Sequence, residues 1–473
     1  MTIENDLAAI CGSDFASDDP AVLGSYLQDT SFTPPGRAEC VAFPKGSEEV
    51  QEIIRYASQR RLPVVPRSSK ISFHGAGIPA KGGIILDLSR MNRVLEVDPA
   101  GKRVKLEAGA SWGQVTPELA KHGLMVCPPL LPHRDKSVVT SAMQREPMLI
   151  PKSEYSEMLL TAEVVLASGE ALRTGTAMGQ GMKGQCFPDA LVPGTRLFMG
   201  AQGTLGIITW AILKAEHRPA KDKLFFIPFE RLEDVPECVY RIQRRMLGSE
   251  CLVLNRLNLA TILAESPGEI EKLSAGLPAW TVLLCLSGFH RLPEEKIAYE
   301  EEALWEITRK LGLKPDVSVT GCGGELIPRL RQPWPDETYW KDHYRGGWAE
   351  VFFYDTLDKA PRYLAAMTEV TSRHGYAAGD IGVYLQPVER ARILFYRFTF
   401  YTDPEDKRQR EMVKEIFVDS SQRAMAMGAL FTTPYGSWAD MVYRRAPAYA
   451  GVLKTVKDAL DPDHILNPGK LCF

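Results

Sequence analysis

Hydrophobic positions recur with helical spacing soon after the first short apolar run of the chain. Four of them fall at positions i, i+3, i+4 and i+7, on one face of a helix: Val50, Ile53, Ile54 and Ala57. Ser47 precedes them as a candidate N-cap. Short apolar runs at 40–44 and 63–66 flank this helix, so the pattern predicts a β-α-β unit that opens into the polar loop RSSKISFHGAG.

Strand-like runs then follow in close succession up to residue 218. Ser111 and Gly123 bracket a helical pattern as N-cap and C′ residue. The pattern predicts a helical lead-in over 1–35 and an α+β domain over 36–218. The runs rich in β-branched and apolar residues lie at 83–88, 94–97, 104–106, 161–167, 171–174 and 206–213.

The composition shifts at His217-Arg218-Pro219, and strand-like and helical patterns alternate beyond it. Strands separated by single helices are typical of an α+β sheet with helices on one face. We therefore expect a domain of two βαβ-like halves over 219–430, followed by a closing segment over 431–473. The strand patterns lie at 225–229, 252–257, 281–289, 350–355, 382–387 and 393–401, and the helical patterns at 232–247, 294–311, 358–374, 407–428 and 447–460.

Composition and charge exclude several classes of protein. The net charge of −3 over 473 residues lacks the basic excess that nucleic-acid binding by phosphate neutralisation requires. No apolar run approaches the roughly 18 residues of a membrane span, and the acidic start MTIENDLAAI is unlike a signal peptide. Nine cysteines without a CxxC pair argue against a disulfide framework or a cysteine metal site, and a reducing cytoplasm is the expected compartment.

Four segments in this order resemble one enzyme superfamily, the vanillyl-alcohol oxidase / p-cresol methylhydroxylase (PCMH) type of FAD-linked oxidases. They are PRSSKISFHGAG followed by GGIILDLSRMNRVLEVD; KLEAGASWGQVTPELAKHGL; TAEVVLASGEALRTG with RLFMGAQGTLGIITWAILK; and the terminal DPDHILNPGKLC. The N-terminal half is most similar to the glycolate oxidase D-subunit / D-lactate dehydrogenase group. The resemblance implies a two-subdomain FAD-binding domain, a ferredoxin-like α+β cap domain for the substrate, and a C-terminal tail that returns to the FAD-binding domain.

Two loops are the first candidates for FAD binding. The diphosphate of FAD needs backbone N–H groups, hydroxyls or a cation, and the loop after residue 65 offers serines and a lysine, although it lacks the glycines usual in relatives. An ordinary serine-rich turn would have the same composition. A second loop has glycines that allow close backbone approach, and the same glycines would also suit a tight turn. The expected contacts are Pro66, Arg67, Ser68, Ser69, Lys70, Ile71 and Ser72 in the first loop, and Gly200, Gln202, Gly203, Gly206, Ile207 and Ile208 in the second.

A third loop, PPLLPHRDKSVVTSAMQREP, stands where relatives carry a glycine-rich segment. Its best contacts are Ser137, Thr140 and Ser141. In the tail, the resemblance implies that Asn467 and Lys470 approach the cofactor, although a surface tail remains open. Relatives with covalent flavin carry a histidine where this chain has a lysine in the first loop, so we expect FAD to be bound non-covalently.

The metal-binding motifs of the hydroxy-acid branch are replaced by AAGDIGVYLQP and LFTTPYGSW, so no metal site is expected. In the phenol-oxidising branch, tyrosines and an arginine hold a phenolate; Tyr384, Arg397 and Tyr435 could do so here, or could simply pack the sheet. In the stretch TYWKDHYRGGWAE, Arg345 is the candidate to bind a substrate carboxylate and His343 is the candidate base. A surface turn would explain the same residues.

The sequence therefore predicts an FAD-dependent dehydrogenase that oxidises a small 2-hydroxy acid or a related alcohol or C–H substrate by hydride transfer to the flavin. Its electrons would pass to an iron–sulfur subunit or an electron-transfer flavoprotein. A homo- or hetero-oligomer is possible. Two alternatives remain open: a metal-free enzyme for alkylphenols or aromatic alcohols, and a non-catalytic flavoprotein subunit for electron transfer.

Overall fold

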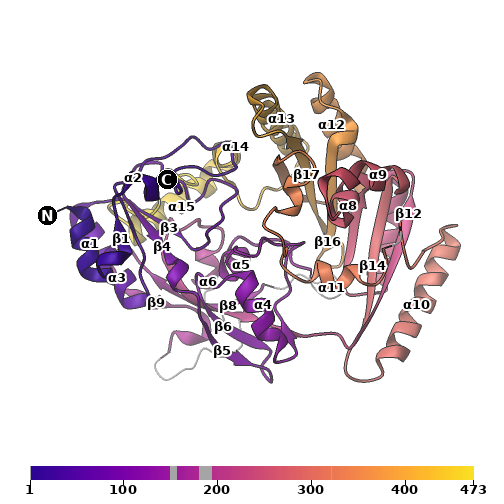
Figure 1. The fold of residues 1–473 in the computed structure, drawn as a ribbon, viewed down its shortest axis with the longest axis horizontal. Helices are drawn as coiled ribbons and strands as arrows, with labels where there is room; N and C mark the ends of the chain where they lie inside the picture. Colours follow the sequence, from indigo (N-terminus) through magenta and orange to yellow (C-terminus); the bar gives the residue numbers. More distant parts are fainter. Residues whose placement is uncertain (1, 150–156, 180–193, 321) are drawn as a thin grey trace.

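Two larger sheets form the first lobe of the protein, and a third large sheet forms the second lobe (Figure 1). A fourth, two-stranded sheet pairs β7 (Leu124–Met125) with β11 (Glu216–His217). A computed structural model describes residues 2–149, 157–179, 194–320 and 322–473. The domain boundaries expected from the sequence, at residues 36, 219 and 431, stay predictions.

The first sheet is built around the predicted β-α-β unit. Helix α3 (Ser47–Arg60) connects two strands that both pair in parallel with β4. All four apolar residues of its predicted face are buried, as expected. The N-cap prediction was wrong by one position, because Gly46 is the extended N-cap and Ser47 is the first helical residue. The strands, in the order β1-β2-β4-β3, are Ala16–Ser17, Cys40–Ala42, Ile84–Asp87 and Val64–Arg67, and α1 (Ile3–Cys11) packs beside α3.

The second sheet is antiparallel and carries short helices. Ser111 caps α4 (Trp112–Ala120) through a capping box with Gln114, as its sequence suggests. The C′ prediction was wrong, because α4 ends at Ala120 and Gly123, with φ of 67°, lies beyond it. The strands, in the order β5-β6-β10-β8-β9, are Val94–Asp98, Arg103–Glu107, Ile207–Lys214, Leu159–Val165 and Ala171–Arg173, and α5 (Val138–Met143) and α6 (Gly194–Phe198) lie nearby.

The third sheet has six strands in two equivalent halves. In each half a helix connects two strands and a third strand inserts between them, which makes a split β-α-β unit. The helices are α7 (Val235–Arg244) and α12 (Ala360–Arg373). The strands, in the order β12-β14-β13-β16-β17-β15, are Lys221–Phe229, Trp280–Gly288, Cys251–Asn255, Ile381–Val388, Ile393–Thr402 and Gly347–Asp355.

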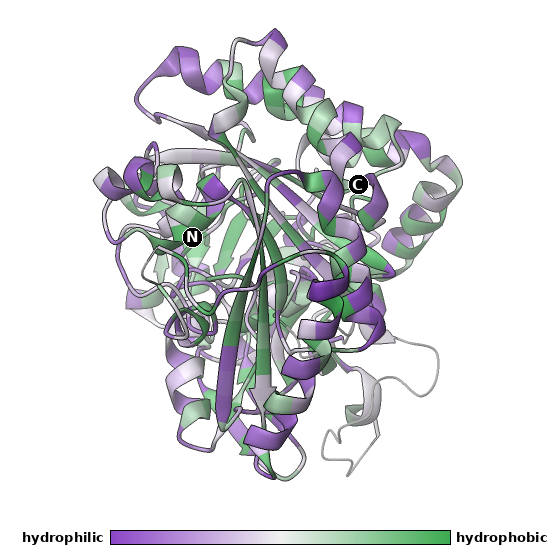
Figure 2. Cartoon of the chain, turned by 90° about the vertical axis from the view of Figure 1, so that its right-hand side faces the viewer, coloured by the Kyte–Doolittle hydropathy of each residue, from purple (hydrophilic) through white to green (hydrophobic). Residues whose placement is uncertain are grey.

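Both faces of this sheet are covered. Helices α7, α10 (Pro293–Lys310), α12 and α13 (Lys407–Ala426) pack on one face. The expectation of helices on one face alone was wrong, because α8 (Arg256–Leu263), α9 (Ile270–Gly276) and α11 (Leu326–Leu330) pack on the other, beside Leu130 and Leu131 of the first lobe. Figure 2 shows the hydrophobic strands between these layers.

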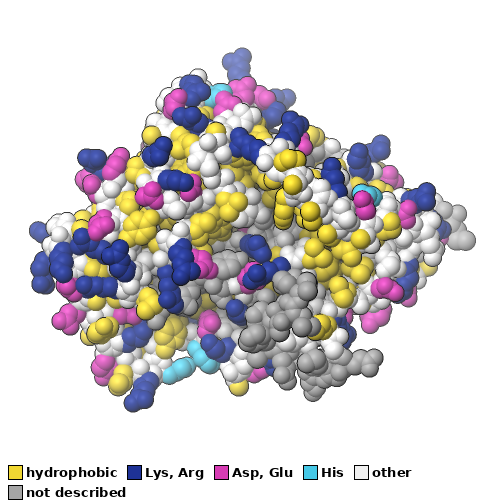
Figure 3. Space-filling view, turned by 180° about the vertical axis from the view of Figure 1, so that it is seen from behind, with side chains coloured by type: hydrophobic (Ala, Val, Ile, Leu, Met, Phe, Trp, Pro, Cys, Tyr) yellow, Lys and Arg dark blue, Asp and Glu magenta, His cyan; other side chains and the backbone are white. Residues whose placement is uncertain are grey.

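The chain finally returns to the first lobe through α14 (Ser437–Arg445) and α15 (Pro447–Leu460) (Figure 1). Beyond α15, Leu466 forms a parallel bridge with Val64 of β3. No helix in the described part of the chain is both long and apolar enough to cross a membrane. Both acidic and basic side chains occur over the face seen from behind (Figure 3).

Candidate active site

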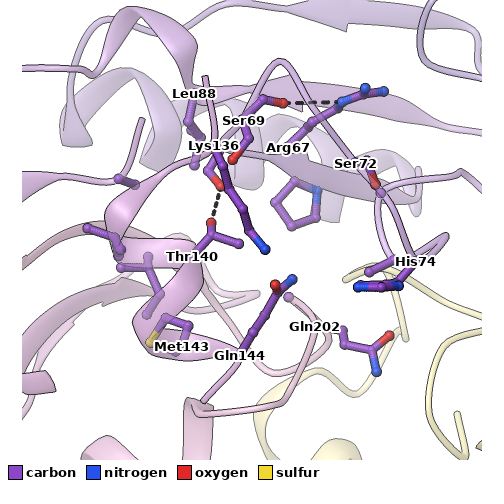
Figure 4. A pocket seen from close by; sticks show the side chains of 18 of the residues that line it. Arg67, Ser69, Ser72, His74, Leu88, Lys136, Thr140, Met143, Gln144 and Gln202 are labelled. Carbon is purple, nitrogen blue, oxygen red and sulfur yellow. Dashed lines mark hydrogen bonds between the residues drawn. The ribbon is translucent and has the colours of Figure 1, made fainter. Parts of the chain in front are cut away.

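A cleft with about 1070 Å³ of open space lies in the first lobe, beside the returning C-terminal segment. Its walls come from the loop after β3, from residues around α5, and from the loop that leads into β10; Tyr435 adds a side chain from the C-terminal segment. Figure 4 shows these side chains converging on one space from separate elements. The cleft brings together segments that are far apart in the sequence.

Serine and threonine hydroxyls hold the first wall against α5. The Ser68 hydroxyl is hydrogen-bonded to that of Thr140, and Ser69 Oγ accepts a hydrogen bond of 2.8 Å from the backbone N–H of Ser137. Arg67 turns back on its own loop and donates to the carbonyls of Ser69 and Lys70 at 3.4 and 3.2 Å. Hydroxyl and backbone groups therefore dominate this wall.

Glycines let the second wall pack closely against the first. Gly203 has φ of 74°, and a Cβ atom there would lie 2.3 Å from Cγ of Pro66. A Cβ atom on Gly206 would lie 2.3 Å from Cγ1 of Val164. Only glycine satisfies both the backbone conformation and the close contact at position 203.

The third wall adds a cation that the sequence analysis did not single out. Lys136 lines the cleft and forms an ion pair with Glu146. Burial would raise the pKa of Glu146, but Lys136 beside it lowers that pKa below its usual value. Gln144 also lines the cleft (Figure 4). An anion entering the cleft therefore meets a partly neutralised lysine.

At one end, the cleft meets a second, outer groove with about 1990 Å³ of open space. Phe73, His74 and Tyr435 line both spaces. The rings of His74 and Tyr435 are stacked with centroids 4.9 Å apart. Burial and the nearby ammonium groups of Lys136 and Lys341 lower the pKa of His74 to about 4, so its imidazole is neutral near pH 7.

A buried charge cluster from the second lobe lies next to these rings. Lys341 Nζ is 2.7 Å from Glu350 Oε1, and Arg397 Nε is 3.6 Å from Glu350 Oε2. Burial opposes ionisation of Glu350, but Arg397 and Lys341 hold its pKa at about 2. Burial lowers the pKa of Lys341 to about 8. Two cations thus face one carboxylate, which leaves positive charge for an anionic ligand.

Arg397 is positioned for this role by strand register. It pairs with Phe352 across β17 and β15, and the Phe352 ring lies 5.3 Å from that of His74. The Nε atom of Arg397 is buried and has no hydrogen-bond partner within the part of the chain that the structure describes. Tyr384 lies next to Arg397, with its ring centroid 5.5 Å from Cζ, and donates to the side-chain oxygen of Gln386.

The other two predicted catalytic residues lie apart from this cluster. Arg345 forms an ion pair of 2.5 Å with Asp380, and His343 packs edge-on against Trp334 at 5.5 Å. Neither residue lines the cleft or the outer groove. Tyr384 and Arg397 do not line these spaces either, and of the five predicted catalytic residues only Tyr435 lines both. Arg397 is connected to the outer groove through Glu350, which lines it.

Two family models match the chain. One is an FAD binding domain over residues 38–175, and the other is the C-terminal domain of FAD linked oxidases over residues 396–471. The chain therefore carries the two domains of FAD-linked oxidases.

Curated relatives of this FAD-linked oxidase cover nearly its whole length at low identity. "Glycolate oxidase subunit GlcD" of Bacillus subtilis is 23% identical and aligns over 99% of this chain and 96% of its own. A "D-lactate dehydrogenase" of Anaerostipes hadrus is 23% identical and aligns over 97% of this chain and 93% of its own. An "uncharacterized FAD-linked oxidoreductase" of Mycobacterium tuberculosis, Rv2280, is 24% identical, over 95% and 94%.

Solved structures share the fold of the FAD-linked oxidase. The 4-ethylphenol oxidase from Gulosibacter chungangensis superposes with a TM-score of 0.85 at 21% identity, over 98% of this chain and 95% of its own. p-Cresol methylhydroxylase superposes with a TM-score of 0.85 at 18% identity, over 99% of this chain and 96% of its own. The predicted PCMH-type fold is confirmed.

The residues of the cleft fit FAD. Its hydroxyls and Lys136 suit a diphosphate. Non-covalent binding agrees with the family. No group of three His, Cys, Asp or Glu side chains that could hold a metal ion occurs within the described ranges.

Most predicted cofactor residues lie on the cleft, although their contacts with FAD stay predictions. Lys70 is exposed and does not line the cleft, and Ser137 and Ser141 lie behind the wall, where they bond to Ala108 and Trp112. Asn467 and Lys470 bind loop carbonyls instead of lining the cleft. The residues on the cleft are Pro66, Arg67, Ser68, Ser69, Ile71, Ser72, Thr140, Gly200, Gln202, Gly203, Gly206, Ile207 and Ile208.

Proposed function

We propose that this FAD-linked oxidase is a dehydrogenase for a small anionic substrate, a 2-hydroxy acid or a related alcohol. The observation that carries the proposal is the guanidinium of Arg397, whose buried Nε has no hydrogen-bond partner in the described ranges and which shares one carboxylate with Lys341. A substrate carboxylate at Arg397 would complete this charge balance. The names of the relatives, glycolate oxidase subunit and D-lactate dehydrogenase, favour the same substrate class.

Bound FAD supplies an acceptor for the hydride that leaves the substrate carbon. In this proposal, Arg397 binds the substrate anion, and Glu350 and Lys341 hold Arg397 in place. The neutral ring of His74 accepts the hydroxyl proton at a ring nitrogen, so the alcohol becomes a carbonyl. The rings of Phe73 and Tyr435 line this end of the cleft, and Trp348 joins them in the outer groove.

The aromatic walls favour a second candidate substrate class, an alkylphenol or aromatic alcohol. Phe73 lies 5.4 Å from Trp348 and 5.8 Å from Tyr339, ring to ring. Such walls suit a flat ring, and Arg397 with Tyr384 would then bind a phenolate oxygen. Both substrate classes would place a negatively charged oxygen at Arg397, but only the second class has an aromatic ring.

We further propose that electrons leave to a protein acceptor, an iron–sulfur subunit or an electron-transfer flavoprotein, in the cytoplasm. Turnover with an artificial dye and none with oxygen would support this arrangement. Rapid reoxidation by oxygen alone would contradict it.

Anaerobic addition of glycolate, lactate, mandelate, 4-alkylphenols and aromatic alcohols tests the substrate proposal. Bleaching of the flavin absorbance by hydroxy acids supports the first class, and bleaching by phenols alone supports the second. If no compound bleaches a flavin that dithionite reduces, the non-catalytic alternative gains support.

A further inference from the structure

The C-terminal segment 457–470 holds the walls of the FAD cleft together through a buried ion pair. Lys457 and Asp461, one helical turn apart, are both fully buried, with Nζ 2.6 Å from Oδ2. Lys457 Nζ also donates to the carbonyl of Thr204 at 2.7 Å and to that of Leu466 at 2.8 Å. One ammonium group therefore connects α15, the glycine loop of the cleft and the tail.

Asp461 fixes the turn that follows. Its carboxylate accepts hydrogen bonds from the backbone N–H groups of Ile465 at 3.0 Å and Leu466 at 2.8 Å. His464 and Asn467 have φ of 52° and 40°, in the left-handed region that side chains other than glycine avoid. Such a backbone persists only where surrounding contacts determine it, and the Lys457–Asp461 pair provides those contacts.

The turn delivers Asn467 between two walls of the cleft. Asn467 Nδ2 donates to the carbonyls of Gln202 at 2.6 Å and Ala76 at 3.0 Å, and its backbone N–H donates to Val64 at 2.9 Å. Lys470 Nζ donates to the carbonyl of Gly75 at 2.7 Å. The tail thus bonds to both the loop after β3 and the glycine loop.

The same contacts reach the aromatic end of the cleft. Gln202, whose carbonyl accepts from Asn467, donates through Nε2 to the carbonyl of Pro434 at 3.0 Å. Pro434 directly precedes Tyr435, which stacks on His74. A shift of the tail would therefore move both the FAD walls and the Tyr435 ring.

We infer that Lys457 is a positioning residue for the cofactor: the Lys457–Asp461 pair sets the spacing of the two loops that enclose FAD, and its loss releases FAD. The pair lies outside the cleft lining, so its effect passes through Thr204, Leu466 and Asn467. The inference requires only that FAD binds in the cleft, and it is independent of the substrate.

The test is the rate of FAD release from the holoenzyme, followed by recovery of free-flavin fluorescence after dilution. The Lys457→Met variant should release FAD roughly tenfold faster or more, since breaking a buried ion pair leaves an unpaired charge. The matched control is Arg331→Met, which breaks a buried pair of 2.6 Å with Glu250 in the second lobe. Its melting temperature should fall similarly, but FAD release should stay near the wild-type rate.

Equal FAD release from wild type and Lys457→Met, or equally fast release from both variants, would overturn the inference. Amide hydrogen exchange of the unmodified enzyme provides a second test in case the variant does not fold. Removal of FAD should speed exchange at Ile465, Leu466 and Asn467 far more than at α10. Unchanged exchange at these three amides would also overturn it.

Discussion

His74 stacks on Tyr435 with ring centroids 4.9 Å apart and ring planes inclined by 22°. His74 comes from the loop after β3 and Tyr435 from the segment before α14, and both line the cofactor cleft and the outer groove. Lys136 with Glu146, and Lys341 with Glu350, influence the imidazole electrostatically. The stacked pair therefore marks the point where cofactor cleft, charge cluster and outer groove meet.

The first prediction concerns stability against pH. Because the folded-state pKa of His74 is about 4 against 6.5 when unperturbed, the unfolded chain binds more protons between these values. The contribution of His74 to stability should thus be fully present above pH 6.5 and be lost as pH falls toward 4. The difference in melting temperature between wild type and the His74→Gln variant should therefore shrink as pH falls from 6.5 toward 4.

The exposed His122 supplies the control for this prediction. The His122→Gln variant should follow the wild-type curve throughout. A His74→Gln variant whose difference from wild type is independent of pH would show that His74 is not buried in its neutral form.

Substitution of Arg397 should remove anion binding. The Arg397→Met variant loses a charge-assisted hydrogen bond worth about 1.5–3 kcal/mol, so kcat/KM should fall roughly tenfold to a hundredfold. Arg345→Met is the matched control, because Arg345 pairs with Asp380 outside the cleft. Steady-state kinetics on an active substrate distinguish the two; a larger loss for Arg345→Met would reverse the assignment.

The contact between the two cofactor loops predicts a difference between two glycines. Gly203→Ala combines a φ of 74° with a Cβ contact of 2.3 Å to Pro66, whereas Gly200→Ala has a φ of 71° but no atom nearer than 3.9 Å. Gly200→Ala should cost about 1 kcal/mol of stability, and Gly203→Ala more, with weaker FAD binding. Chemical denaturation and FAD titration measure both effects, and equal behaviour of the variants would refute the close packing.

The Lys341–Glu350 pair predicts non-additive effects. Glu350→Gln leaves Lys341 and Arg397 buried without their carboxylate, which should cost about 3–5 kcal/mol of unfolding free energy. The double variant Lys341→Met, Glu350→Gln should cost less than the sum of the two single variants, because the buried ammonium is removed with its partner. Denaturation of all three variants tests this coupling; strict additivity would exclude it.

Local patterns in the sequence were sufficient for much of the fold. The apolar face of α3 follows from its helical periodicity, and the strands β14, β16 and β17 follow from continuous runs rich in apolar and aromatic residues. Residues 256–263 were harder, because the apolar run 252–257 continues from strand β13 into helix α8, and Asn255 caps that helix with its side chain. Periodicity does not mark such a strand-to-helix boundary.

The candidate site could not be predicted in full, because it is formed by contacts between residues that are far apart in the sequence. Lys136 and Glu146 are ten residues apart, on either side of α5, and a buried pair of that kind gives no local signal. Glu350 meets Arg397 only through the register of β15 and β17. The guanidinium of Arg345 could bind a substrate carboxylate, but it already forms an ion pair with Asp380. No motif in the sequence indicated that partner.

Anaerobic flavin reduction in three proteins tests the central claim most directly: wild type, Arg397→Met and Arg345→Met, each mixed with the panel of 2-hydroxy acids, alcohols and phenols. The account predicts that at least one anionic substrate bleaches the flavin of wild type and Arg345→Met, and that Arg397→Met responds much more slowly. Bleaching that is equally fast in Arg397→Met, or absent from a wild-type flavin that dithionite reduces, would contradict it.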